Sequence, residues 1–91
     1  MIEFEWDPKK SASNERKHEV TFQEASTIFS DRLAMTFADP DHSDDELRHI
    51  TFGLSKNGRL LVVAHTDRGN KIRIISARLM DRKERKIYEE D

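Results

Sequence analysis

The fold is decided by residues 57–78, which read NGRLLVVAHTDRGNKIRIISAR. Asn57-Gly58 is the strongest short signal for a β-hairpin, because both residues tolerate the positive φ angles of a tight turn. Residues 60–64 are apolar on both faces, which is typical of a central strand covered on both sides. A second turn at 67–70 leads into a strand at 71–78. These residues predict two neighbouring strands in the middle of an antiparallel sheet.

Two helices are predicted ahead of this sheet. Residues 2–6 alternate apolar and acidic side chains like a half-buried strand, and Asp7-Pro8 then supplies an N-cap and a proline at the first helical position. The helix that follows, over about 8–18, is highly polar, so we expect it to lie partly in solvent. Thr21 and Glu24 fit a capping box that opens a second, more amphipathic helix ending at about residue 30.

Further strands and a last helix complete the pattern. Alternating apolar residues predict strands over 33–38 and 49–54, and a capping-box pattern at 81–84 predicts a short C-terminal helix. Strands flanked by helices, rather than alternating with them, indicate the α+β class. We therefore predict a single α+β domain over residues 1–91. It has an antiparallel sheet of four to five strands, two N-terminal helices packed on one face and a short C-terminal helix. The first strand pairs either at an edge or with the last hairpin.

Composition excludes several classes of protein. The 91 residues are 35% hydrophobic and 37% charged, which leaves room for one thin core. Cysteine is absent, which rules out disulfides and thiolate metal sites, and no apolar run approaches the roughly 18 residues of a membrane helix. The four histidines lack metal-ligand spacing, and there is no Gly-rich phosphate loop. We expect a cytoplasmic protein with no membrane, metal or other cofactor.

Charge is divided unevenly along the chain. Residues 1–47 hold five Lys and Arg against twelve Asp and Glu, a net charge of −7, whereas residues 48–91 hold eleven against six, a net charge of +5. Such asymmetry indicates a nucleic-acid or acidic partner, unless the fold mixes the two halves in space.

The basic residues of the second half gather around the last strand and helix. They are Arg73, Arg78, Arg82, Lys83, Arg85 and Lys86. Guanidinium groups bind phosphate bidentately and stay charged, so on a rigid strand they suit a phosphorane-like transition state. RNA fits such a site without a metal, because its own 2′-hydroxyl attacks the adjacent phosphate once a base accepts the proton. Candidates for the base and the acid are His18, Lys17, Glu84 and Tyr88, of which His18 best matches neutral pH.

Structural interpretations compete with these chemical ones. Arg82, Lys83 and Lys86 are interleaved with acidic residues and suit a solvated helix face. Arg73 and Arg78 are five positions apart, so in a regular strand they point to opposite faces unless a bulge intervenes, and Arg78 is favoured for the site. Other side chains are expected to be structural or solvated: His49 and His65 as ordinary strand residues, Trp6 as a core anchor, and His42 in an acidic loop where solvent or a partner fits as well as catalysis.

Five motifs spread over nearly the whole chain carry a family resemblance. They are Phe4-Glu5-Trp6-Asp7-Pro8, Asn14-x-x-Lys17-His18-x-Val20-Thr21-Phe22-x-x-Ala25, Gly53-x-Ser55, Arg73-Ile74-Ile75-Ser76-Ala77-Arg78 and Glu84-Arg85-x-x-Tyr88. In combination they resemble the BrnT family of bacterial type II toxins. The resemblance implies a RelE-like fold, metal-independent ribonuclease activity that blocks translation, and neutralisation by a BrnA-type antitoxin. It also implies that the complex represses its own operon, with operator DNA contacted mainly by the antitoxin.

The resemblance also implies site residues by position. The expected catalytic residues are His18, Arg78, Glu84, Arg85 and Tyr88. The expected RNA-binding residues are Lys17 and Arg73, to which the basic cluster adds Arg82 and Lys83. In this hypothesis Arg78 and Arg85 hold the scissile phosphate, while His18 or Tyr88 moves protons. One position departs from the family pattern, which often has glycine where this chain has Glu19. If Glu19 forms a left-handed helix C-cap, it costs about 1 kcal/mol relative to glycine.

Two other functions stay open. The first is a non-catalytic binding module that acts through its antitoxin or another protein target, since no acid–base pair stands at a fixed spacing. The second is a DNA-binding module that acts alone and would lose duplex binding steeply with salt. The acidic loop at 39–45 is a candidate contact for a basic antitoxin segment, through Asp41, Asp44 and Asp45.

Overall fold

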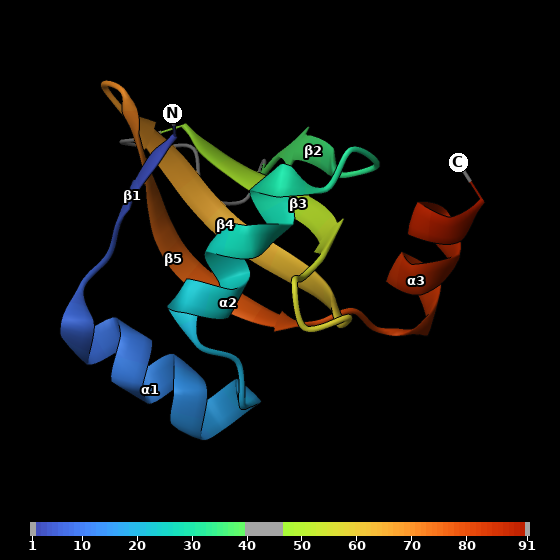
Figure 1. Ribbon diagram of the computed structural model, residues 1–91, viewed down its shortest axis with the longest axis horizontal. Coiled ribbons are helices and arrows are strands. Elements are labelled where there is room, and N and C mark those ends of the chain that lie inside the picture. Colours follow the sequence, from blue (N-terminus) through green and yellow to red (C-terminus); the bar gives the residue numbers. More distant parts are fainter. Residues whose placement is uncertain (1, 40–46, 91) are drawn as a thin grey trace.

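The computed structural model describes residues 2–39 and 47–90 of the chain. Three α-helices, a 3₁₀ helix and five strands make up this part (Figure 1). In chain order they are β1 (Glu3–Glu5), α1 (Pro8–His18), α2 (Phe22–Ser26), the 3₁₀ helix η1 (Thr27–Ser30), β2 (Met35–Ala38), β3 (Arg48–Leu54), β4 (Leu60–Arg68), β5 (Lys71–Leu79) and α3 (Arg82–Glu89). No helix in the described ranges is long and apolar enough to span a bilayer. His42, Asp41, Asp44 and Asp45 lie outside the described residues.

The five strands form one mixed sheet in the order β1-β5-β4-β3-β2. The four strands from β2 to β5 are antiparallel neighbours, as predicted, and β4 is central. β1, however, runs parallel to β5, with Phe4 opposite Ile72, so the expectation of a purely antiparallel sheet was wrong. Period-2 alternation marks a strand but carries no information on its direction, which α1 sets by folding back over the edge of β5.

The second helical segment is not one continuous α-helix. It tightens into η1 after Ser26, because the Thr27 hydroxyl donates to the Glu24 carbonyl at 2.6 Å and the last turn closes with i→i+3 bonds. The strand predicted from residue 33 begins at Met35. Asp31 holds the intervening turn, since its Oδ1 accepts from the Leu33 backbone N–H at 3.0 Å.

Apolar side chains pack on both faces of the sheet. The main core lies between the sheet and the N-terminal helical segments; its fully buried members are Val20, Phe22, Ala25, Ile28, Leu61, Val63, Ile74 and Ala77. Trp6 packs against this core as expected, with its ring edge-on to Phe22. A smaller cluster of Phe52, Val62 and Met80 lies on the other face, where Tyr88 of α3 packs against it. Figure 1 shows α2 in front of the sheet, α1 below it at the lower left, and α3 to its right.

Two residues of the Gly53-x-Ser55 motif are structural. A Cβ on Gly53 would lie 2.8 Å from the Cβ of Ile28, so only glycine lets η1 approach β3 this closely. The Ser55 hydroxyl donates to the buried Glu24 carboxylate at 2.7 Å. Arg59 pairs with the same carboxylate, and its hydrogen bond is the main reason that the pKa of Glu24 is lowered. This cluster ties the β3–β4 hairpin to α2.

Asn14 fixes helix α1 against the edge of β5. Its side-chain amide donates to the carbonyls of Val20 at 3.0 Å and Ala77 at 2.8 Å, and its carbonyl accepts from the Ala77 N–H at 3.1 Å. The side chain thus replaces a strand partner at the place where β1 has ended. The helix then stops at Glu19, which adopts the left-handed C-cap conformation with φ 57°. The predicted strain at this position is therefore present.

Candidate active site

A β-bulge in β5 places its two arginines on one face of the sheet. Ala64 pairs with Ser76 and His65 with Ile74, so Ile75 is an extra residue without a partner on β4. Before the bulge Arg73 pairs with Thr66, and after it Arg78 pairs with Val62. These two partners are four positions apart on β4, which has no bulge there. Cross-strand partners share a face, and alternate residues of β4 do too. Arg73 and Arg78 therefore lie on one face of the sheet, although their five-residue spacing would put them on opposite faces of a regular strand.

Arg78 and the start of α3 form one hydrogen-bonded unit. Nη1 and Nη2 of Arg78 each donate to a different oxygen of Glu84, both at 2.8 Å, and Nη1 also donates to the Leu79 carbonyl. Glu84 at the same time accepts from the Asp81 backbone and completes the predicted capping box. The Arg78 hydrogen bonds are the main reason that the pKa of Glu84 is lowered. The pair therefore stays ionised at neutral pH.

The other expected residues of α3 differ in their surroundings. The Arg85 guanidinium extends back along the chain and donates to the Met80 carbonyl at 3.3 Å. Arg82 and Lys83 are exposed on the outside of the helix, as the solvated-face interpretation predicts. Arg73 lies farther along β5 and pairs with Glu5 of β1 at 2.9 Å.

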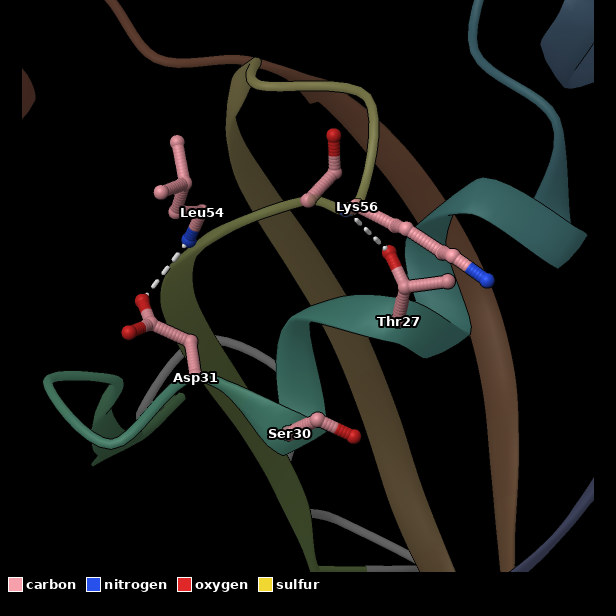
Figure 2. A pocket seen from close by; sticks show the side chains of 6 residues that line it. Thr27, Ser30, Asp31, Leu54 and Lys56 are labelled. Atoms are coloured by element: carbon pink, nitrogen blue, oxygen red, sulfur yellow. Dashed lines mark hydrogen bonds between the residues drawn. The ribbon is translucent and has the colours of Figure 1, made fainter.

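Tyr88 lies one turn after Glu84 on α3, but its hydroxyl group bonds Asp31 and not a member of this unit. Its phenol donates to Asp31 at 2.5 Å, and burial followed by that hydrogen bond raises the pKa of Tyr88 to about 12. Burial of Asp31 opposes ionisation, but the bonds from Tyr88, Leu54 and Leu33 outweigh it and lower the pKa of Asp31. Asp31 also lines the pocket of about 440 Å³ in Figure 2, with Lys56 and Ser30 beside it. Tyr88 thus keeps its proton at neutral pH and links α3 to the loop after η1 through its hydrogen bond to Asp31. A phenol that keeps its proton is a poor general base.

Lys17 and His18 lie at a second pocket, between α1 and β5. Its volume is about 220 Å³, and it is lined by Lys10, Ser13, Asn14, Lys17, His18, Ile75 and Ser76. Ser76 pairs with Ala64, so it shares the sheet face of Arg73 and Arg78. Two residues of strand separate Ser76 from Arg78, about 7 Å. The predicted site residues therefore fall into two groups along β5, which are the pocket with Lys17 and His18 and the unit around Arg78. The Tyr88 hydroxyl is bonded to Asp31.

Sequence comparison identifies the family. A family model described as the ribonuclease toxin BrnT of type II toxin–antitoxin systems matches residues 6–84. The chain belongs to the BrnT family. The crystal structure of the Brucella abortus ribonuclease toxin BrnT, solved at 1.1 Å resolution, is similar with a TM-score of 0.66 and 20% sequence identity. The match covers 90% of this chain and 100% of that one, and it shows a shared fold. No curated protein matches the chain by sequence.

Several residues that shape the candidate site of this BrnT-family chain were not predicted from the sequence. Asn14 belongs to one of the five motifs of the family resemblance. Its bonds to Ala77, however, join residues 63 positions apart in the sequence, and no local pattern predicts them. Lys10 carries a signal that was overlooked, since it stands seven positions before Lys17 and therefore on the same helix face. Ser76 lines the pocket beside the bulged residue Ile75, and its packing against α1 could not be predicted from the strand pattern.

Two histidines of this BrnT-family protein lie in the sheet, as predicted. His65 and His49 are cross-strand neighbours with stacked rings 5.7 Å apart, and the Nε2 of His65 bonds the Thr51 hydroxyl at 2.7 Å. Nδ1 of both rings is buried without a hydrogen-bond partner. Burial, helped by His49, lowers the pKa of His65 to about 4, so the ring is neutral at physiological pH. Among residues 2–39 and 47–90, no three His, Asp or Glu side chains gather as metal ligands.

Proposed function

We propose that this BrnT-family chain is a metal-independent endoribonuclease that cleaves RNA, inhibits translation and is neutralised by a cognate BrnA-type antitoxin. Family membership supports a ribonuclease toxin of a type II system. The observation that carries the site is the position of Ser76, which lines the pocket of His18 and lies two positions before Arg78 on the same face of β5. The pocket of His18 and the guanidinium of Arg78 therefore adjoin one stretch of β5, with Ser76 and Arg78 about 7 Å apart along the strand.

The cleavage chemistry follows from the groups at this stretch. His18 accepts the proton of the 2′-hydroxyl, whose oxygen attacks the adjacent phosphorus. The bond from phosphorus to the 5′-oxygen breaks, and that oxygen takes up a proton from water. The products are a 2′,3′-cyclic phosphate and a 5′-hydroxyl. Tyr88 is less suited to the role of base, because its pKa is raised to about 12.

Arg78 stabilises the charge that develops on the phosphate. A guanidinium has five N–H donors, and the bonds to Glu84 and Leu79 leave Nε–H and one Nη2–H of Arg78 for the substrate. The Arg78 side chain is 43% exposed, so these donors are accessible. Glu84 acts as a positioning residue that holds the Arg78 guanidinium in place. Arg85 adds a second positive charge. Lys17, Arg73, Arg82 and Lys83 contribute to RNA binding.

The test is RNA cleavage by the isolated protein in excess EDTA. Arg78→Ala should lose at least about a hundredfold in rate, the scale of one preorganised charge-stabilising donor. Arg32→Ala is the matched control, because Arg32 is an exposed arginine of the turn after η1. Both variants should bind the antitoxin as the wild type does. Cleavage that needs a divalent metal, or that is unchanged in Arg78→Ala, would overturn this mechanism.

A second candidate function is a non-catalytic binding module that acts through its antitoxin or another protein target. Both arginines of β5 are already paired with carboxylates, Arg73 with Glu5 and Arg78 with Glu84, which suits a purely structural role. Absence of cleavage on free RNA and on translating ribosomes, with antitoxin binding intact, would favour it. A DNA-binding module acting alone is tested by duplex binding of the isolated chain at low salt.

The remaining family features form part of the same proposal. We propose that the fold is RelE-like, with both N-terminal helices on one face, that the protein works in the cytoplasm, and that operator DNA is bound only by the toxin–antitoxin complex. Under the antitoxin hypothesis, charge reversal in the acidic loop at Asp41, Asp44 and Asp45 weakens antitoxin affinity.

A further inference from the structure

We propose that the pocket between α1 and β5 is a phosphate subsite for single-stranded RNA, in which Lys10 and Lys17 bind a backbone phosphate next to the one that is cleaved. The inference rests on the proposed function and names substrate contacts of the same site. Lys10, Ser13 and Ser76 are the residues that it adds.

The helix presents both lysines in a fixed geometry. Lys10, Asn14 and Lys17 stand at positions i, i+4 and i+7 of α1, so they share one face of the helix. The buried amide of Asn14 makes three hydrogen bonds that fix this face against β5. The lysines therefore stand one turn before and one turn after a rigid attachment point. Because α1 is already ordered in the free protein, RNA binding does not have to order it, and the entropic cost of binding is lower.

Both lysines of the pocket are available to a ligand. Neither Lys10 nor Lys17 forms an ion pair with a residue in the described part of the chain. Arg73 and Arg78, by contrast, each already pair with a carboxylate. The pocket lining contains no carboxylate, and its hydroxyl groups from Ser13 and Ser76 supply further donors. Such a lining favours an anion with several acceptor oxygens.

The position of the pocket selects the anion. Ser76 lines the pocket and lies two residues before Arg78 on the same strand face. A separation of about 7 Å along the strand is close to the reach of one nucleotide in an extended chain. An RNA strand that runs along β5 therefore places one phosphate at Arg78 and a neighbouring phosphate at the lysines.

The experiment measures binding of a fully 2′-O-methylated RNA oligonucleotide, which lacks the attacking hydroxyl and is not cleaved. Fluorescence anisotropy gives Kd over a range of salt concentrations. Lys10→Ala should weaken binding about tenfold, the scale of one charge-assisted contact. It should also reduce the slope of log K against log salt by about 0.7, the value for one phosphate contact on a single strand. With cleavable RNA, KM rises while kcat is unchanged.

The matched control is Lys9→Ala. Lys9 is the neighbouring exposed lysine of α1, and its side chain does not line the pocket. Its variant should keep the wild-type affinity and salt slope, and both variants should keep the wild-type melting temperature. Equal affinities and slopes for Lys10→Ala and the wild type would overturn the subsite. So would a wild type that does not bind the oligonucleotide at low salt, or a Lys10→Ala effect confined to antitoxin binding.

These outcomes are separable from failure of the proposed function. A wild type that binds the methylated oligonucleotide through Lys10 but cleaves no RNA would refute the nuclease proposal and leave the subsite standing. A protein that cleaves RNA with the same KM before and after Lys10→Ala would keep the nuclease and refute the subsite.

Discussion

Replacing Asn14 with alanine should destabilise the protein and disorganise the site together. The Ala77 N–H and C=O both lose their partner, and Ala77 is fully buried, so water does not replace the bonds. Each buried, unsatisfied backbone group costs about 1–3 kcal/mol. The third lost hydrogen bond is the one that the Val20 carbonyl accepts. This carbonyl can reorient more easily, because Val20 lies in the segment that connects α1 to α2. The expected loss of unfolding free energy is about 3 kcal/mol.

Chemical denaturation measures this loss, with thermal unfolding as a second reading. For a domain of this size, about 3 kcal/mol lowers the melting temperature by roughly 12–24 °C. Ser13→Ala is the matched control, because Ser13 is an exposed neighbour on α1, and its variant should stay within about 0.5 kcal/mol of the wild type. A loss below about 1 kcal/mol in Asn14→Ala would contradict this prediction, since it would mean that the Asn14 hydrogen bonds do not hold α1 on β5.

Three further predictions concern other parts of the fold. Glu19→Gly should raise the unfolding free energy by about 1 kcal/mol, since the cap has φ 57°, and an unchanged denaturation midpoint would contradict this. Gly53→Ala should cost about 1–3 kcal/mol, because the new Cβ would lie 2.8 Å from the Cβ of Ile28, and a wild-type melting temperature would show that η1 yields easily. The pKa of Glu24 is lowered in the folded state, mainly by Arg59, so its contribution is complete above the unfolded pKa of about 4.5 and is lost as pH falls through the folded value. Acid denaturation curves should therefore fall more steeply for the wild type than for Glu24→Gln, and parallel curves would count against the pair.

Local signals predicted most of the elements because they act over a few residues. Gly58 has φ +82° in the turn that Asn57-Gly58 predicted, and Asp81 with Glu84 forms the capping box expected from their spacing. The run at 60–64 became the central strand, since a covered strand must be apolar on both faces.

The errors arose where contacts between distant segments decide the outcome. The direction of β1 depends on the path of α1, and alternation in residues 2–6 says nothing of it. The bulge at Ile75 leaves no mark in the sequence, although it determines whether Arg73 and Arg78 share a face. The expected site residues stay a prediction, and their division between the pocket of Lys17 and His18 and the unit around Arg78 could be seen only in the fold.

We propose that the stretch of β5 from Ser76 to Arg78 is a metal-independent site for RNA cleavage. The experiment that tests this compares the rates at which the isolated wild type, Arg78→Ala and Arg32→Ala cleave RNA in excess EDTA, with product ends identified. We expect cleavage by the wild type and Arg32→Ala that leaves 2′,3′-cyclic phosphates, and a loss of at least about a hundredfold in Arg78→Ala. Equal rates in all three proteins, or cleavage that stops in EDTA, would contradict it.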